Sequence, residues 1–301
     1  MELRVEERRP KQVLNRVRGM PFAWSINPYR GCRHECVFCY ARETHAYLER
    51  DGIGSWGTDL VAKVDAAAVL RRELQRVRPG ERVALGTATD PYQPLEARYF
   101  ITRAILGELA RAAVATDLIT RSPLVLRDLE LLRELARRTP LTVAISLPTL
   151  DAALARKLEP TVAAPAQRLR TVRALAAAGI RTYVAVAPIV PGLTDAVDSL
   201  RAVFCAAAEA GASGAWHGLL NLGPAARERF FAFLQADFPH LVAPYERAYR
   251  GRYGTAALAA RTKARVGAAR AGLHFSARPR SLRAELTAHS GAQLDLFTRS
   301  A

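Results

Sequence analysis

Three of the four cysteines of this chain lie in one short segment, at Cys32, Cys36 and Cys39. Their spacing is C-x-x-x-C-x-x-C, with Phe38 directly before the last cysteine and Tyr40 directly after it. Three thiolates on one loop can bind three irons of a cubane cluster and leave the fourth iron without a protein ligand. A vacant coordination position is where chemistry takes place, because a closed site only holds structure or passes electrons. The segment therefore predicts a reactive metal centre.

Two alternatives to a cluster remain open at this point. Three cysteines with His34 or His45 would complete a zinc site, although zinc sites usually contain paired ligands and no second pair is present. The second alternative is that the cysteines are unconnected buried core residues. Their occurrence within one short segment disfavours this alternative. Disulfides are also disfavoured, because residues 1–11 are charged and contain no apolar run typical of a signal peptide. No stretch is apolar enough to span a membrane, so we expect a cytoplasmic protein.

The charge of the chain points to a polyanionic partner. Its 301 residues contain 44 Lys and Arg against 28 Asp and Glu, a formal net charge of +16. Most of the basic residues are arginines, which suit bidentate contacts to phosphate groups. This favours nucleic acid over a membrane surface. The alternative is that a composition rich in Ala and Arg reflects a GC-rich genome.

Short apolar runs alternate with longer helical patterns along the chain, which predicts parallel strands joined by crossover helices. The predicted strands are residues 22–27, 82–86, 117–120, 141–146, 181–187 and 214–220. The predicted helices are residues 41–50, 65–77, 99–113, 124–138, 165–178 and 195–210. Six such units fit an α/β fold of the partial (β/α)6 TIM-barrel type, in which loops after the strands carry the active site.

We expect four segments along the chain. A basic N-terminal segment covers residues 1–20, and the partial barrel covers 21–240. A basic helical extension follows at 241–285, and a flexible tail ends the chain at 286–301. Both ends therefore lie outside the predicted catalytic unit.

The segments after the predicted strands add to the cysteine pattern. They are residues 86–96, 119–128, 145–148, 158–160, 167–169 and 187–195. With the cysteine segment, this succession resembles the radical S-adenosylmethionine (radical SAM) enzymes, in particular the spore photoproduct lyase-like, or DNA repair photolyase-like, branch. The resemblance implies a [4Fe-4S] cluster and S-adenosyl-L-methionine, which fills the vacant iron position. It also implies reductive cleavage of that cofactor to a 5′-deoxyadenosyl radical.

The resemblance also implies roles for individual residues. The three cysteines would ligate the cluster. The implied cofactor-binding residues are Phe38, Tyr40, Thr89, Asp90, Arg121, Ser146, Glu159 and Arg168. Arg121 stands where this branch usually carries lysine, and Arg168 is expected to pair with the cofactor carboxylate. Glu159 is expected to orient Arg168 or to bond the cofactor, with a helix-terminal ion pair as the alternative.

One departure from the resemblance concerns the hydrogen-atom donor. The lyase uses a cysteine in the segment after the second strand, whereas residues 86–90 of this chain are Gly-Thr-Ala-Thr-Asp. A threonine O–H bond is too strong to replace the thiol, so the lyase's own reaction is not expected. The catalytic residues stay unassigned, with Tyr92, Asp90 and His217 as candidates and Tyr40 as a second tyrosine able to relay a radical.

The C-terminal part of the chain contains two further patterns. Residues 244–273 interleave tyrosines with arginines, which is typical of a surface that grips phosphates and stacks on unpaired bases. The alternative is a solvated helical face. Residues Gln293–Phe297 read Gln-Leu-Asp-Leu-Phe and resemble the peptide that docks bacterial repair proteins on the DNA sliding clamp. The alternative is a tail that folds back onto its own domain.

These patterns together predict a lyase-like radical SAM enzyme that acts on nucleic acid, with damaged or modified DNA favoured. An RNA-modifying enzyme is the second hypothesis, because basic charge and aromatic residues do not separate the two. A metal-stabilised nucleic-acid-binding protein without turnover is the third. As an enzyme of this class, it would need a one-electron donor such as flavodoxin or ferredoxin.

Overall fold

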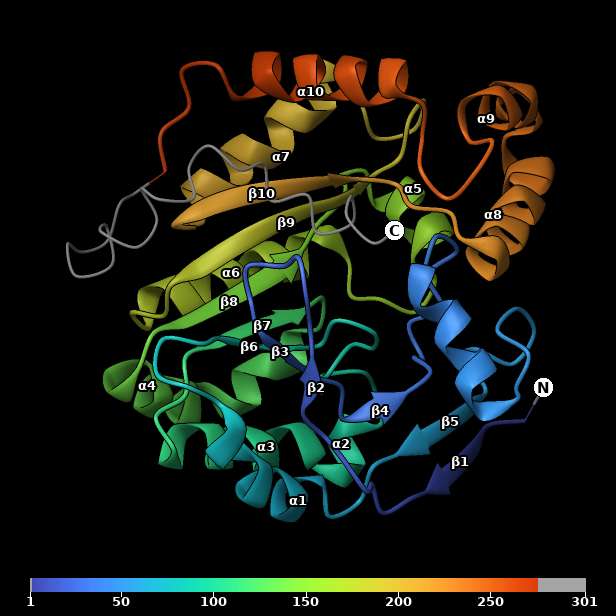
Figure 1. Cartoon of the computed structure of the whole chain (residues 1–301). Helices are drawn as coiled ribbons and strands as arrows, with labels where there is room; N and C mark the ends of the chain where they lie inside the picture. The colour runs from blue at the N-terminus through green and yellow to red at the C-terminus, as the bar shows by residue number, and fades with distance from the viewer. Residues whose placement is uncertain (1, 276–301) are drawn as a thin grey trace.

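A curved seven-stranded sheet forms the centre of the computed structural model, which describes residues 2–275 (Figure 1). In spatial order its strands are β10 (Gly214–Leu219), β9 (Thr182–Ile189), β8 (Leu141–Ser146), β7 (Thr116–Thr120), β6 (Val83–Leu85), β3 (Trp24–Ile26) and β2 (Asn15–Arg16). Six neighbouring strands pair in parallel, namely β3, β6, β7, β8, β9 and β10. β2 is an antiparallel edge strand beside β3. The carboxyl ends of the six parallel strands therefore meet at one edge of the sheet.

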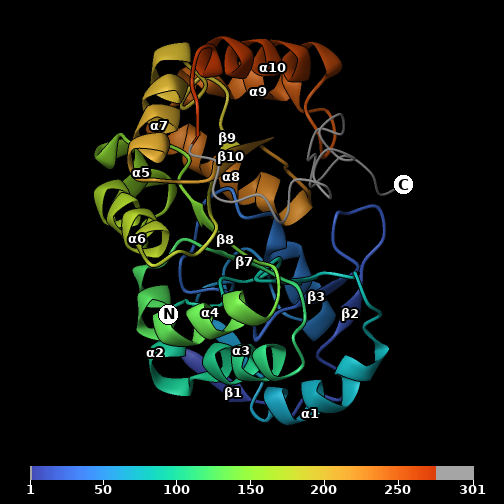
Figure 2. The same cartoon turned by 90° about the vertical axis from the view of Figure 1, so that its left-hand side faces the viewer.

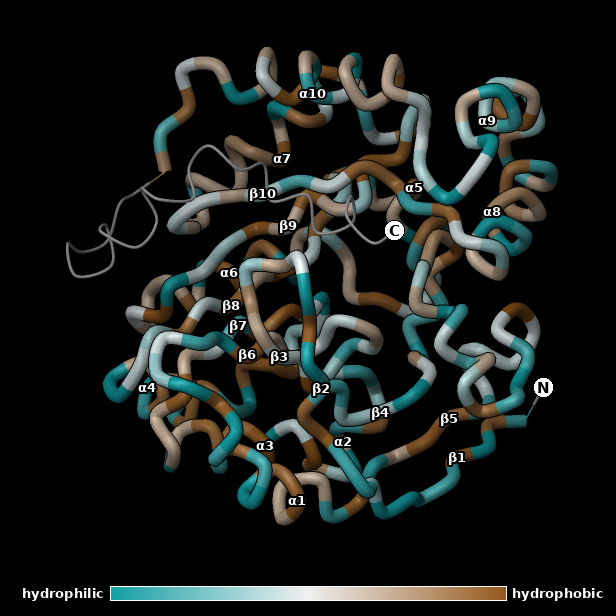
Figure 3. The backbone as a smooth tube through the Cα atoms, in the orientation of Figure 1, coloured by the Kyte–Doolittle hydropathy of each residue, from teal (hydrophilic) through white to brown (hydrophobic). Residues whose placement is uncertain are grey.

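Helices cover the outer face of this sheet, as Figure 2 shows from the side. They are α1 (Ala66–Glu73), α3 (Ile101–Arg111), α4 (Leu129–Arg138), α6 (Pro165–Ala177) and α7 (Val197–Glu209), with the short α2 (Glu96–Tyr99) and α5 (Ala152–Leu158) near the strand ends. Each longer helix buries one apolar stripe; in α4 this stripe contains Leu132 and Leu135. In Figure 3 the buried strand β6 is coloured hydrophobic and the edge strand β2 hydrophilic. The expected partial-barrel fold is confirmed.

A second, three-stranded sheet consists of β1 (Arg4–Glu7), β5 (Asp59–Ala62) and β4 (Tyr29–Arg30), in that order. The sequence analysis did not predict it, because β1 is mostly charged and β4 is only two residues long. β4 ends just before the cysteine segment, so this sheet fixes the point at which that segment begins.

Three helices follow the last strand: α8 (Pro224–Asp237), α9 (Val242–Ala248) and α10 (Ala256–Arg270). α10 packs on α7 across the top of the molecule in Figure 1. Tyr245 and Tyr249 are buried here, with ring centroids 5.4 Å apart and hydroxyls that donate to the carbonyls of Pro191 and Leu220. Tyr245 and Tyr249 are therefore not available to stack on bases, because their rings complete a hydrophobic core with Phe230.

The six predicted strands and their crossover helices are all present. The predicted helix at 41–50 is a 3₁₀ helix over Tyr40–Leu48. Within residues 2–275 no helix is long and apolar enough to cross a membrane. The predicted clamp motif at Gln293–Phe297 lies outside the described residues.

Candidate active site

The cysteine segment enters the site through a glycine that no other residue replaces without strain. Gly31 has a φ of +74°, and a Cβ built on it would lie 2.4 Å from Leu60 Cδ2 and 2.9 Å from the Trp56 carbonyl oxygen. The Gly31 carbonyl accepts hydrogen bonds from Thr89 Oγ1 at 2.7 Å and from Gln93 Nε2 at 3.2 Å. The segment after β6 therefore clamps the start of the cysteine segment.

The three cysteines line one cavity in a largely buried region. Cys32 and Cys36 are buried, and Cys39 is partly buried. Burial, with a smaller contribution from neighbouring acidic groups and thiols, raises the pKa of Cys32 to about 12. Burial also raises the pKa of Cys36 and Cys39, although Arg121 opposes the shift at both. Thiolates at these positions need a strong positive partner, such as iron, to be stable.

The donor set fits a cubane cluster better than a single metal ion. Across residues 2–275 no three His, Cys, Asp or Glu side chains are arranged to hold one ion. In a cubane each thiolate binds a different iron, so the sulfur atoms need not surround one point. His34 Nε2 lies 3.4 Å from an Asp90 oxygen, and His45 packs on the Trp56 ring. Neither histidine serves as the fourth ligand that a zinc site requires.

A cavity of about 430 Å³ joins the cysteine segment to the carboxyl ends of the parallel strands. All three cysteines line it, and so do six of the eight predicted cofactor residues: Phe38, Tyr40, Thr89, Asp90, Arg121 and Ser146. Glu159 and Arg168 lie behind its wall. The volume falls within the range of about 300–1,000 Å³ typical of small-molecule sites.

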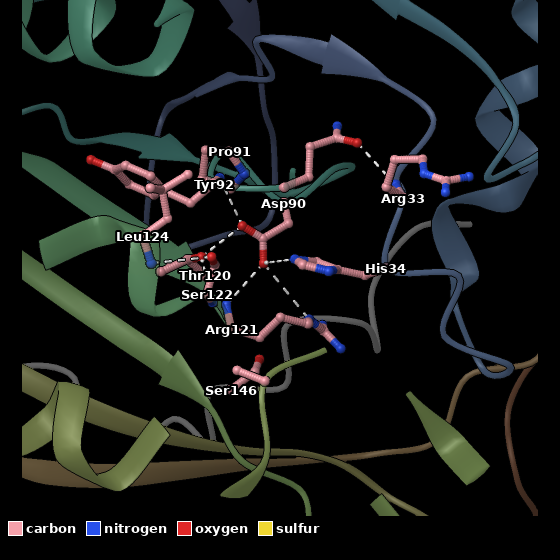
Figure 4. Close-up of polar contacts among 12 residues, drawn as sticks. Arg33, His34, Asp90, Pro91, Tyr92, Thr120, Arg121, Ser122, Leu124 and Ser146 are labelled. Atoms are coloured by element: carbon pink, nitrogen blue, oxygen red, sulfur yellow. Dashed lines mark hydrogen bonds and ion pairs between the residues drawn. The ribbon is translucent and has the colours of Figure 1, made fainter. Parts of the chain in front are cut away.

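Asp90 connects three parts of the site (Figure 4). One of its oxygens accepts hydrogen bonds from the Tyr92 amide at 2.8 Å and Thr120 Oγ1 at 2.6 Å. The other accepts the Arg121 amide at 2.8 Å and lies 3.4 Å from His34 Nε2. Burial opposes ionisation of this carboxyl group, but His34, Arg121 and Thr120 outweigh it and hold its pKa at about 2. Asp90 is therefore an ionised positioning residue, with both oxygens occupied.

Arg121 lines the cavity beside the cysteines. Its Nη1 lies 3.1 Å from Cys36 Sγ and 2.5 Å from Glu159 Oε1. The second Glu159 oxygen lies 2.5 Å from Arg168 Nη2, so the expected Glu159–Arg168 contact is present. Arg168 also donates to the Ser146 carbonyl at 3.0 Å and is only 1% exposed. Arg168 therefore does not line the cavity, whereas Arg121 does.

The three catalytic candidates do not come together. Asp90 lines the cavity, whereas Tyr92 is fully buried and donates its hydroxyl to Asp128 at 2.9 Å. Burial, reinforced by Asp128, raises the pKa of Tyr92 far above its usual value. On β10 Trp216, Gly218 and Leu219 line the cavity and His217 does not, and the pairing of β10 with β9 shifts register between His217 and Leu219. Tyr40 lines the cavity and donates its hydroxyl to the Thr87 carbonyl.

Two positioning residues were missed by the sequence analysis. Asn27, after β3, accepts the Ala88 amide at 2.7 Å and donates to Thr87 Oγ1 at 3.2 Å. Gln93 accepts the Arg33 amide at 2.9 Å while its nitrogen donates to Gly31. Both have uncharged amide side chains, and their only sequence signal is their position. Asn27 is the last residue of the predicted strand 22–27, and Gln93 lies in the segment after the predicted strand 82–86.

Comparison with known proteins identifies the class. Residues 26–202 match the model of the Radical SAM superfamily, and the chain belongs to this superfamily. It is 40% identical over 244 residues to an uncharacterized protein of Mycobacterium tuberculosis H37Rv, covering 80% of this chain and 72% of the relative. It is 26% identical over 185 residues to an uncharacterized protein of Methanocaldococcus jannaschii, covering 62% of this chain and 67% of the relative.

Solved structures of spore photoproduct lyase share the fold. A point mutant of the lyase aligns with a TM-score of 0.66 at 13% identity, covering 90% of this chain and 82% of the lyase. The lyase complexed with dinucleoside spore photoproduct aligns with a TM-score of 0.63 at 15% identity, covering 88% and 78%. The protein is a radical SAM enzyme, and its cofactors are a [4Fe-4S] cluster and S-adenosyl-L-methionine.

Proposed function

We propose that this radical SAM enzyme acts on nucleic acid, with damaged or modified DNA favoured over RNA. The observation that carries the proposal is the cavity of about 430 Å³, which is lined by the three cysteines, by Trp216 of β10, and by Asn221 and Arg252, which follow β10 in the chain. A substrate that enters the cavity past these residues would approach the end lined by the three cysteines. The net charge of +16 favours a polyanion, and the lyase of similar fold was solved with a dinucleoside photoproduct.

The cofactors supply one-electron reductive cleavage of a C–S bond, and the chain positions them. We propose that Cys32, Cys36 and Cys39 hold the cluster. Arg121 would present its guanidinium to the cofactor carboxylate, because it is the arginine of the cavity lining that contacts a cysteine, Cys36. Phe38 and Tyr40 would pack the adenine. The wall at Ser146 suits a ribose hydroxyl.

Thr89 and Asp90 would shape the methionine end of the cofactor pocket indirectly. Thr89 holds Gly31, and Asp90 holds Arg121 through the Arg121 amide. Glu159 and Arg168 would act from behind the wall by fixing the Arg121 side chain. Burial of these ionic groups keeps water away from the reacting atoms.

The reaction differs from that of the lyase in its last step. Gly86, Thr87 and Ala88 line the cavity, and they belong to the segment in which the resemblance would place the lyase's hydrogen-donating cysteine. We therefore propose a radical reaction on a base or lesion that does not depend on a cysteine thiol in this segment.

The test is anaerobic reconstitution followed by reduction with dithionite and measurement of 5′-deoxyadenosine. We expect release that rises with ultraviolet-damaged DNA more than with intact DNA, and a Cys36→Ala control without release. Stimulation by RNA alone would replace DNA by RNA as the substrate. No stimulation by either polymer, with full iron content, would overturn the nucleic-acid proposal.

Delivery to DNA is a separate proposal. We propose that Gln293–Phe297 docks on a DNA sliding clamp, with Leu296 and Phe297 filling an apolar pocket. Deleting residues from 293 onward is expected to abolish clamp binding in a pull-down while iron content and cofactor cleavage stay unchanged. Loss of the cluster on truncation would contradict this role and place the tail in the fold.

We keep three further expectations as proposals. The chain divides functionally at residues 20, 240 and 285, as the charge pattern indicates. Its electron donor is a flavodoxin or ferredoxin. The activity takes place in the cytoplasm, where thiols stay reduced and DNA is available.

A further inference from the structure

Tyr253 is an exposed aromatic side chain at the cavity. Its side chain is 40% exposed, whereas the neighbouring Tyr245 and Tyr249 are 3% and 0% exposed. It lines the cavity, and within residues 2–275 no aromatic ring or cation is stacked on it. An exposed aromatic face at the mouth of a reactive cavity serves no purpose in the core, so it is available to a ligand.

The backbone around Tyr253 is held firmly. The Arg252 carbonyl accepts the Leu222 amide at 2.8 Å, which ties this segment to the end of β10. A Cβ at Gly254 would lie 2.8 Å from Leu258, so the chain packs closely against α10 on the other side. The Arg252 guanidinium pairs with Glu43 of the 3₁₀ helix that follows the cysteines. The backbone that carries Tyr253 is therefore held in place, while its exposed side chain stays open to a ligand.

Arg18 also lines the cavity and comes from a segment far from Arg252 in the chain. Arg18 lies in the loop between β2 and β3, together with Met20 and Phe22, and all three line the cavity. Arg18 is exposed and makes no ion pair with the described residues, unlike the nearby Arg16, which pairs with Glu81 at 2.6 Å. Figure 1 shows this loop extending in front of the sheet toward β9 and β10. We call Arg18, Arg252 and Tyr253 the rim.

We propose that the rim binds an unstacked nucleotide next to the one that reacts. Its base stacks on Tyr253, and the flanking phosphates pair with Arg18 and Arg252. Every base offers a π face to such a platform, and a guanidinium matches two phosphate oxygens. The cavity of about 430 Å³ would also hold the cofactor beside the cysteines, so a duplex does not fit into it. Only an extruded nucleoside would reach its mouth, and the neighbouring nucleotide would be gripped at the rim. This inference rests on the proposed function and names the contacts that would deliver the substrate.

The stacking contact is tested with the reconstituted full-length protein and a single-stranded oligonucleotide containing 2-aminopurine. We expect Tyr253→Ala to weaken binding by about 5- to 100-fold in fluorescence anisotropy, from the usual cost of losing one base–aromatic stack. The quenching of 2-aminopurine should be lost as well. Tyr253→Phe keeps the ring and is expected to bind like the wild type. The control is Tyr47→Ala, since Tyr47 is 76% exposed but does not line the cavity.

The phosphate contacts are tested by the salt dependence of the same binding. Arg18→Gln and Arg252→Gln are each expected to lower the slope of log affinity against log salt by about one. Arg137→Gln, on the exposed side of α4, is the matched control and should leave the slope unchanged. Equal losses in Tyr253→Ala and Tyr47→Ala would overturn the rim proposal. So would competition by a polyglutamate peptide as strong as that by the oligonucleotide.

The outcomes separate the rim from the proposed function. If damaged DNA stimulates 5′-deoxyadenosine release with the same half-saturating concentration in Tyr253→Ala and wild type, the rim proposal fails and the function stands. If no nucleic acid stimulates release but Tyr253→Ala still weakens oligonucleotide binding selectively, the function fails and the rim stands as a binding site.

Discussion

The two ends of the cavity are built in opposite ways. At the inner end, buried groups hold one another: Asp90 accepts two backbone amides, and Arg121 contacts both Cys36 and Glu159. At the rim, Arg18 has no ion-pair partner among the described residues, and Tyr253 exposes much of its ring. Buried ionic networks fix geometry, because any misplaced charge there is costly. Exposed side chains adapt to a partner at little cost.

This difference suggests a division of labour. The cofactor end needs fixed distances, since radical chemistry depends on the position of the reacting atom. The substrate end must admit and release a large polymer. The comparison predicts that inner-end substitutions damage cofactor binding or folding, whereas rim substitutions change nucleic-acid affinity alone.

The largest effect is expected from Gly31→Ala. The new Cβ would contact Leu60 Cδ2 and the Trp56 carbonyl in a backbone conformation that alanine disfavours by about 1–2 kcal/mol. We expect the cysteine segment to be displaced, with loss of most of the bound iron and a Tm lowered by several degrees. Iron analysis and thermal unfolding measure the two effects.

Gly179→Ala provides the matched control for this substitution. Gly179 has a φ of +82°, but nothing lies within 4 Å of its Cβ position. It therefore carries the backbone strain without the collision. Equal iron content in the two variants would show that Gly31 matters only as a turn residue, and the clamp on the cysteine segment would lose its support.

The second largest effects separate the two arginines of the inner end. Arg168→Ala leaves Glu159 buried with one fewer cation, so we expect destabilisation of about 3 kcal/mol, as for other broken buried ion pairs. Arg121→Gln removes the guanidinium on the cavity wall, so we expect S-adenosylmethionine to bind at least about 10-fold more weakly, as when a charged hydrogen bond is lost. Denaturant unfolding and equilibrium dialysis measure these quantities.

Arg103→Gln is the control for the cofactor measurement, because Arg103 pairs at 2.5 Å with another buried carboxylate, that of Asp128, away from the cavity. It should leave cofactor affinity unchanged. If Arg168→Ala weakened cofactor binding more than Arg121→Gln, the assignment of Arg121 as the cofactor-facing arginine would be wrong.

The sequence predicted the inner end better than the rim, for a physical reason. Cysteine spacing and strand-end polar residues are local signals, and Cys32, Asp90 and Arg121, which they single out, all line one cavity. The position of Arg168 behind the wall was not predictable, because it depends on how α6 packs against β8. A residue's type does not reveal which of two arginines faces a cavity.

The rim was not predictable because its members are distant in the chain. Arg18 and Tyr253 come together only when the loop after β2 and the segment after α9 meet at one mouth. The alternation of Tyr and Arg over 244–273 suggested a nucleic-acid surface, but pattern alone did not show that Tyr245 and Tyr249 are buried. Burial of an aromatic residue in a short helix depends on tertiary packing.

The smallest effect is expected at Glu43, which links the two ends. Its carboxylate pairs with Arg252 and lies so close to Gly223, the residue before α8, that a Cβ there would be 1.4 Å from Glu43 Oε1. Glu43→Gln is expected to cost only about 0.5 kcal/mol in stability, as is usual for partly exposed pairs. It also frees Arg252 for phosphate. Oligonucleotide affinity at low salt should therefore rise by about 2- to 5-fold, with a steeper salt dependence.

Gly223→Ala should break the same link by a different route, because its methyl group would displace the Glu43 side chain without removing the charge. Both variants are expected to release Arg252, so both should steepen the salt dependence, with the larger gain in affinity in Glu43→Gln. If instead both variants lost iron while oligonucleotide affinity stayed constant, Glu43 would belong to the inner end. Arg252 would then support the cysteine segment and belong to the inner end as well. The rim would consist of Tyr253 and Arg18 alone.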